Sequence, residues 1–221
     1  MELTDAVSGN LSNSKLFKEY LKEQLEKWNV KGISGALILP STENSVKSEV
    51  APFASGKSDV ENDFDMDPST WLQFASISKM VGAVYAIELF QKFDISMDSP
   101  VNNVLAEYGS PFRLTSTTND ISLGDEVTFR MLLSHTAALG MHYVNGIPLS
   151  EDFPPILDLL TGKYEQSRGY DAVFVHEKPG VNFSYSGASF LVLQHIIEII
   201  EDKEVSDSLD TFIRDDEGRI R

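Results

Sequence analysis

The sequence has 221 residues, 42% of them hydrophobic and 24% charged, which excludes bulk disorder and is enough for one domain with a real core. Its 34 acidic and 18 basic residues give a formal net charge of −16, which argues against nucleic acid and anionic membranes as partners. Cysteine is absent, so disulfides and thiolate metal sites are excluded. No apolar run reaches the roughly 18 residues of a membrane span. The first residues lack the pattern of a signal peptide, which predicts a cytoplasmic protein.

The N-terminal third of the sequence predicts a helix followed by a β-hairpin. Residues 1–14 are polar and predict a loose arm. Residues 15–29 predict an amphipathic helix, whose apolar positions are Leu16, Tyr20, Leu25 and Trp28. Short apolar runs over 33–39 and 49–54, separated by a polar turn, predict two paired strands.

The rest of the sequence predicts helices joined by loops. The most apolar candidate is residues 76–93, and a helix that is apolar nearly all round is expected to be buried. Further helices are predicted at 127–133, 156–160 and 188–200. Residues 201–221 carry eight acidic and four basic residues and predict a solvated helix and tail.

Ser76 and Lys79 form an S-x-x-K pattern at the start of the apolar helix. The spacing places both on one face, and the free N–H groups of a first helical turn favour negative charge developing at Ser76. Burial would lower the pKa of Lys79, which would let it accept the serine proton. The alternative is a structural lysine that extends its amine to solvent. A second match, Ser12 to Lys15, lies in the polar arm and is discarded.

Tyr185 lies between a Pro-Gly turn and the last apolar helix. A phenolate beside a cationic lysine is stabilised and is a candidate general base, whereas a lone tyrosine is more commonly a core residue with a satisfied hydroxyl. No G-x-S-x-G elbow accompanies His135, so we expect a structural histidine bonded to the backbone.

Metal sites are not favoured by the sequence. There is no H-E-x-x-H zinc motif. Asp63 to Asp67 begins like an EF-hand loop, but Pro68 replaces the required glycine and Phe74 the required glutamate.

Taken together, four segments resemble the serine β-lactamase and penicillin-binding-protein superfamily, specifically its class C β-lactamase-like esterase and peptidase branch. The resemblance covers about residues 15–213, and its matching segments come in the family's order: Phe74–Lys79, Ala86–Val101, Val127–Leu139 and Pro179–Gly187.

The resemblance implies an α/β fold (an α+β sandwich) in which helices flank an antiparallel sheet. It implies an α/β portion over 15–99, a mainly helical and loop insertion over 100–185, and a return helix with an acidic tail over 186–221. By the same resemblance, the last strands of the family are missing from this chain.

The resemblance also implies the roles of the site residues. Ser76 would be the acylated nucleophile and would give one oxyanion N–H, Lys79 would relay its proton, and Tyr185 would activate it and protonate the leaving group. Gly187 takes the substrate-binding position of an asparagine in the family's Y-x-N triplet. The implied function is a serine hydrolase that forms an acyl-enzyme on a small ester or amide, with a carboxylesterase type favoured and no cofactor or metal.

The family's third motif, K-T-G or H-x-G on a strand beside the site, has no match in this sequence. Three expectations stay open: half of a longer enzyme, a companion chain that supplies the missing strands, or a catalytically incomplete pseudoenzyme or scaffold. In the last two cases the isolated chain would leave one face of the Ser76 helix uncovered.

Overall fold

The computed structural model describes residues 14–39, 49–117, 121–140, 146–148, 150–164 and 169–214. The arm predicted over residues 1–14 lies almost wholly outside these residues, as do residues 215–221 of the predicted tail. The chain divides into two compact units, residues 1–73 and 74–221.

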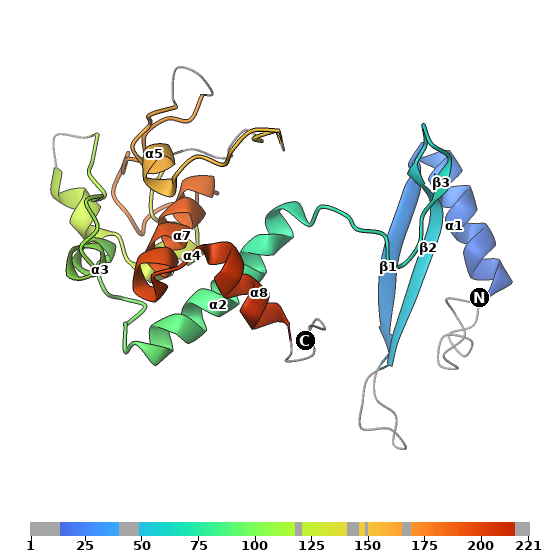
Figure 1. Ribbon diagram of the computed structural model, residues 1–221, viewed down its shortest axis with the longest axis horizontal. Coiled ribbons are helices and arrows are strands. Elements are labelled where there is room, and N and C mark those ends of the chain that lie inside the picture. Colours follow the sequence, from blue (N-terminus) through green and yellow to red (C-terminus); the bar gives the residue numbers. More distant parts are fainter. Residues whose placement is uncertain are drawn as a thin grey trace. The chain divides into compact units, whose positions relative to one another are not determined.

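The N-terminal unit contains one helix and a small antiparallel sheet (Figure 1). Helix α1 covers Lys15–Lys27, and the sheet has the order β1 (Gly32–Leu39), β2 (Glu49–Asp59) and β3 (Phe64–Asp65). The predicted hairpin is confirmed, because β1 pairs with β2 from Gly32 opposite Gly56 to Leu39 opposite Glu49. The second strand is longer than predicted and continues into the acidic segment.

The predicted apolar face of α1 is wrong at three of its four positions and right at Leu25, which is half-buried. Leu16, Tyr20 and Trp28 are exposed, whereas Phe17 lies edge-on against Phe53 of β2 with 5.2 Å between ring centroids. The half-buried positions follow the four-residue spacing Phe17, Leu21 and Leu25. The periodicity predicts the helix itself. It does not predict which apolar face packs against the sheet, because α1 has two neighbouring rows of apolar side chains and either could do so.

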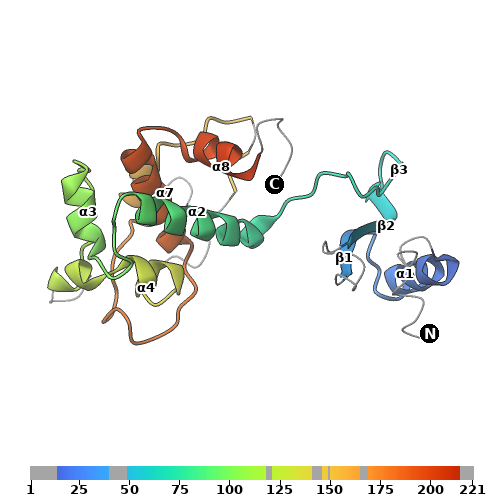
Figure 2. The same cartoon turned by 90° about the horizontal axis from the view of Figure 1, so that it is seen from below.

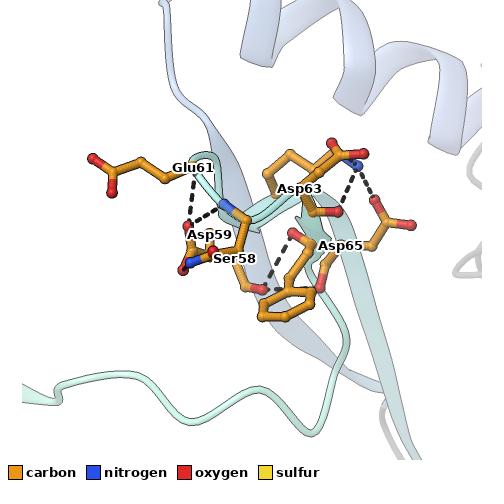
Figure 3. Close-up of polar contacts among 8 residues, drawn as sticks. Ser58, Asp59, Glu61, Asp63 and Asp65 are labelled. Atoms are coloured by element: carbon orange, nitrogen blue, oxygen red, sulfur yellow. Dashed lines mark hydrogen bonds and ion pairs between the residues drawn. The ribbon is translucent and has the colours of Figure 1, made fainter.

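The acidic segment after β2 is a tight turn stabilised by its own carboxylates (Figure 3). Asp59 accepts the N–H groups of Glu61 and Asn62 at 2.9 and 3.0 Å. The Lys57 ammonium lies 2.9 Å from the carboxylate of Asp63 and 2.6 Å from that of Asp65. The carboxylates of Asp63 and Asp65 therefore pair with a lysine of β2.

The second unit is helical (Figure 1, Figure 2). Its regular elements in chain order are η3 (Ala75–Ile77), α2 (Ser78–Lys92), α3 (Val101–Glu107), η4 (Ile121–Glu126), α4 (Phe129–Leu133), α5 (Ile156–Leu160), α7 (Gly187–Glu201) and α8 (Val205–Ile213). The helices predicted at 127–133, 156–160 and 188–200 are thus confirmed to within two residues at each end, whereas α3 and η4 were not predicted.

Helix α7 is the centre of this unit and packs against α2, α4, α5 and α8. It begins at a cap in which the Ser186 side chain accepts the Ser189 N–H, and it ends at Asp202 in the left-handed conformation. Its apolar face buries five aliphatic side chains almost completely, namely Val192, Leu193, Ile196, Ile197 and Ile200. Burial of such side chains contributes about 1.5–3 kcal/mol each, which makes α7 the main support of the unit.

The expected burial of α2 is only half right. Ala86, Leu89 and Phe90 are buried in the core, and the Phe90 ring packs on Phe129 with 4.4 Å between centroids. The opposite face carries an exposed row of apolar side chains, Ile77, Met80, Val84 and Ile87, which are 56%, 70%, 50% and 37% exposed. We call these four residues the α2 stripe.

Among the described residues, every helix is too short or too polar to cross a membrane.

Candidate active site

Ser76 lies in a sharp turn at the start of the helical unit. Ala75 adopts a left-handed backbone with φ of +46°, a conformation that is strained for a residue with a Cβ. The 3₁₀ turn η3 follows, closed by the Ile77 N–H donating to the Phe74 carbonyl at 3.1 Å, and α2 starts at Ser78. The turn leaves Ser76 exposed, two residues before the α-helix, whereas the sequence predicted it inside the first helical turn.

Three of the predicted residues meet at one hydroxyl group. The Tyr185 phenol donates to Ser76 Oγ at 2.8 Å, although 109 residues separate the two in the chain. The Lys79 ammonium also donates to Ser76 Oγ, at 3.4 Å, across the predicted three-residue spacing. Ser76 Oγ therefore has a short contact to a phenol and a longer one to a cation.

The Lys79 cation also acts on the tyrosine. Its Nζ lies 5.3 Å from the centre of the Tyr185 ring and 5.6 Å from that of Phe190. A hydrogen bond from Lys79 lowers the pKa of Tyr185 below its ordinary value, and the Ser76 hydroxyl and the lysine charge act in the same direction. The Tyr185 phenol is therefore easier to deprotonate than an ordinary tyrosine, and its phenolate is the form that accepts a proton.

The segment that carries Tyr185 is hydrogen-bonded to the turn after α4. The Gly180 N–H donates to the Thr136 carbonyl and the Ser184 N–H to the His135 carbonyl, both at 2.8 Å. On the other side of the tyrosine, the Ser186 hydroxyl donates to the Gly140 carbonyl at 2.9 Å. Two segments that the sequence singled out separately are therefore one structural unit.

His135 is bonded to the backbone, as expected. Its Nδ1 accepts the Ser186 N–H at 3.2 Å, and its ring lies against Tyr185 with 4.4 Å between centroids. Burial and then the nearby Lys79 charge lower the pKa of His135. The ring is in contact with the tyrosine rather than with Ser76, so the geometry does not form a Ser-His pair.

Gly187 is the first residue of α7, two residues beyond Tyr185. It has no side chain, so the amide that the resemblance places at this position is absent. An open hollow of about 300 Å³ is lined by Ala138, Leu139, Gly140, His176, Glu177 and Ser184, and this lining includes neither Gly187 nor Ser76. Two larger hollows, of about 740 and 800 Å³, are lined by α1 with β2 and by α5, α7 and α8, and neither lining includes Ser76.

The described residues contain no group of three or more histidine, cysteine, aspartate or glutamate side chains that could hold a metal ion. One of the four histidines of the sequence, His142, lies outside the described residues.

Sequence reasoning missed two features of the site, the strained Ala75 and the contact of His135 with Tyr185. The sequence carries no signal for the first, because it depends on the backbone φ angle of Ala75. It carries none for the second, because that contact depends on the pairing of two distant segments.

Comparison with known proteins assigns the sequence to a family. The Beta-lactamase family model matches residues 22–217. The sequence matches no curated protein.

Solved structures agree in fold. The chain is similar to a D-amino acid amidase from Ochrobactrum anthropi SV3, with a TM-score of 0.65 and 20% identity over 95% of this chain and 48% of the amidase. It is also similar to an octameric penicillin-binding protein homologue from Pyrococcus abyssi, with a TM-score of 0.60 and 21% identity over 87% of this chain and 40% of that protein. A putative β-lactamase from Bacteroides dorei gives 0.53 and 17% over 88% of this chain and 48% of the other.

The chain thus spans about half the length of the solved structures that it matches. Because the family model covers most of the sequence and the S-x-x-K serine meets its tyrosine in space, the chain belongs to the β-lactamase family of serine hydrolases.

Proposed function

We propose that this chain carries the nucleophile half of a serine hydrolase that forms an acyl-enzyme on a small ester or amide, with carboxylesterase activity favoured. The observation that carries the proposal is the convergence of the Tyr185 phenol and the Lys79 ammonium on Ser76 Oγ, at 2.8 and 3.4 Å. A serine hydroxyl is a weak nucleophile unless a neighbouring base takes its proton, and the phenolate of Tyr185 is in hydrogen-bond range to do so.

The proposed reaction has two proton transfers in each half. Ser76 Oγ attacks the substrate carbonyl carbon while its proton passes to the Tyr185 phenolate. The phenol then gives that proton to the leaving alcohol or amine, which departs as the acyl-enzyme forms. In the second half, Tyr185 takes a proton from water, the resulting hydroxide attacks the acyl carbon, and the proton returns to Ser76. Lys79 stays a cation throughout and stabilises each phenolate.

The residue at position 187 and one similar structure bear on the substrate class. Gly187 in place of an amide side chain favours an ester over a β-lactam. One similar structure is named a D-amino acid amidase, so amides of D-amino acids are the second substrate class to test.

The experiment is covalent labelling of the folded chain with a fluorophosphonate. Labelling that disappears in Ser76→Ala is expected, and mass mapping should place the adduct on Ser76. A folded chain that no fluorophosphonate labels would contradict the proposal. A panel of p-nitrophenyl esters, D-amino acid amides and a chromogenic β-lactam then separates the substrate classes.

A second candidate is a chain that is catalytically incomplete alone and is completed by a companion polypeptide. The α2 stripe favours it, because four apolar side chains at helical spacing on one face are typical of a surface that another chain covers. Intact mass spectrometry of the protein from its natural source tests this idea. A stoichiometric second chain, or a species well above 24.6 kDa, would support completion. A lone species of that mass that fluorophosphonates do not label would favour the pseudoenzyme.

A further inference from the structure

We infer that His135 is the positioning residue for Tyr185. Its neutral imidazole accepts a hydrogen bond from the main chain beside the phenol, and a proton on Nδ1 breaks this bond. The inference rests on the proposed function, in which Tyr185 moves the proton of Ser76. It assigns to His135 a part in the acid limit of the reaction, which the family resemblance does not give it.

His135 accepts hydrogen bonds from the backbone on both sides of Tyr185. The Ser184 N–H donates to the His135 carbonyl at 2.8 Å, and the Ser186 N–H donates to the ring Nδ1 at 3.2 Å. The two bonds hold the main chain at the residues on either side of Tyr185, together with the bond from the Ser186 hydroxyl to the Gly140 carbonyl. The second bond depends on the ring and is the one that a change in protonation can remove.

The ring also supports the phenol directly. It is tilted by 37° against the Tyr185 ring at 4.4 Å, and Phe183 and Phe190 contact the same imidazole at 6.0 and 5.7 Å between centroids. Aromatic surfaces on several sides leave the imidazole little freedom to turn away.

The accepted bond fixes the protonation state of the ring. A nitrogen that accepts an N–H carries no hydrogen, so the neutral His135 holds its proton on Nε2. A doubly protonated ring has two donors, and its Nδ1–H would then face the Ser186 N–H. The bond would be lost and the chain beside Tyr185 released.

The groups around His135 favour the neutral ring. Lys79 faces it from α2, Tyr185 from the segment before α7, and Phe190 from α7. On its own side, Arg130 of α4 is paired with Asp98 at 2.7 and 2.9 Å. Burial and the Lys79 cation lower the pKa of His135, so the ring is neutral at pH 7 and gains its proton only on acidification below its ordinary value of about 6.5. Activity should therefore fall as the pH falls through the pKa of His135.

The backbone at His135 supplies a matched variant. Its φ is +56°, in the left-handed region that asparagine tolerates better than most residues. The Oδ1 of asparagine can occupy the place of Nδ1, accepts a hydrogen bond and does not titrate. His135→Asn therefore keeps the hydrogen bond and removes its pH dependence, whereas His135→Leu removes both the acceptor and the charge.

The experiment measures the rate of Ser76 labelling by a fluorophosphonate between about pH 5 and about pH 9 for the full chain and both variants. The wild-type rate is expected to fall on the acid side. His135→Asn should keep at least about a third of the plateau rate and lack the part of the fall that lies below about pH 6.5, whereas the fall caused by protonation of the Tyr185 phenolate remains in both the wild type and this variant. His135→Leu should lose about tenfold or more at every pH. Circular dichroism checks that each variant is folded.

A second measurement on the wild-type chain does not depend on catalysis. Nitrogen-15 shifts of the His135 ring should show a proton on Nε2 at neutral pH and a titration midpoint that coincides with the part of the acid limb of labelling below about pH 6.5. A proton on Nδ1, or an unchanged acid limb in a folded His135→Asn, would overturn the inference while Ser76 labelling still stood. Absence of Ser76 labelling in the folded wild type at every pH would overturn the proposed function and, with it, the catalytic part assigned to His135.

Discussion

The environment of Ser76 Oγ assigns different parts to its two neighbours. The phenol contact at 2.8 Å is in the ordinary range of a hydroxyl–hydroxyl hydrogen bond, whereas the ammonium contact at 3.4 Å is at the long end. Proton transfer falls off steeply with distance, so Tyr185 is the better proton acceptor and Lys79 acts mainly through its charge. The pKa of Tyr185 is lowered first by its hydrogen bond from Lys79, then by that from Ser76, and to a smaller extent by the lysine charge.

Tyr185→Phe and Lys79→Ala should each slow Ser76 labelling by about 10²–10⁴-fold, because each removes a member of the proton-transfer site. Rates with a fluorophosphonate at saturating and limiting concentrations measure the effect. Tyr108→Phe and Lys92→Ala, which remove the same groups elsewhere in the helical unit, are the matched controls. A Tyr185→Phe variant that is labelled as fast as its control would exclude the phenol as the base.

Ala75→Gly should stabilise the helical unit by about 0.5–1 kcal/mol, since glycine adopts the +46° φ of this position without a Cβ clash. The gain is smaller than the full strain because glycine also has more freedom in the unfolded chain. The midpoint of urea unfolding measures it. Ala106→Gly, on an exposed site inside α3, is the control of opposite sign and should lose about 0.5–1 kcal/mol. Equal losses in both variants would mean that Ala75 is unstrained in solution.

At the scale of single elements, α2 has two faces with different tasks. One face joins the core, and next to it the Tyr85 phenol donates to Glu201, which also accepts the Ser208 hydroxyl at 2.6 Å. This carboxylate links α2, α7 and α8. Burial and the bond to Glu201 raise the pKa of Tyr85 to about 12, the opposite of what happens at Tyr185. A neighbouring carboxylate and a neighbouring lysine thus give two tyrosines of one fold opposite character.

Substitution in the α2 stripe should change association rather than stability. Val84→Lys should reduce light scattering and the fluorescence of a bound hydrophobic dye, because it interrupts an exposed apolar row, and should shift the free energy of unfolding by less than about 0.5 kcal/mol. Leu89→Ala, on the buried face of the same helix, is the contrasting variant and should lose about 2–5 kcal/mol. Dye binding that stays unchanged in Val84→Lys would mean that the stripe is already covered in solution.

The elements that the sequence predicted are those with strong periodicity and clear ends. The aliphatic run over residues 188–200 predicted α7 to within one residue at each end. The sequence could not reveal which row of α1 packs or that one face of α2 is exposed, because both depend on what lies opposite the helix. Of the site, the S-x-x-K spacing and Tyr185 could be predicted, while the His135 contact could not, since it arises from long-range pairing of two loops.

At the scale of the whole molecule, the charge balance and the buried histidines set the response to pH. The net charge of −16 falls in magnitude on acidification, which relieves repulsion among the acidic groups. His195 acts in the opposite direction. It is only 3% exposed, its Nε2 lies 2.8 Å from the Ser110 hydroxyl, and burial lowers its pKa.

The free energy of unfolding should therefore decrease as the pH falls below about 6.5, because the unfolded chain then binds a proton that folded His195 excludes. The stabilisation is fully present above that pH and is lost as the pH falls toward the lowered pKa of the folded state. One histidine changes stability by at most about 1.4 kcal/mol per pH unit, so a loss of about 1 kcal/mol is expected between about pH 7 and about pH 5.5. Urea unfolding at constant ionic strength measures it.

His195→Gln places an amide where Nε2 contacts Ser110 and does not titrate, so the slope of the free energy of unfolding against pH should decrease in this variant. A slope equal to that of the wild type would show that other groups, and not the buried histidine, control the acid side of stability.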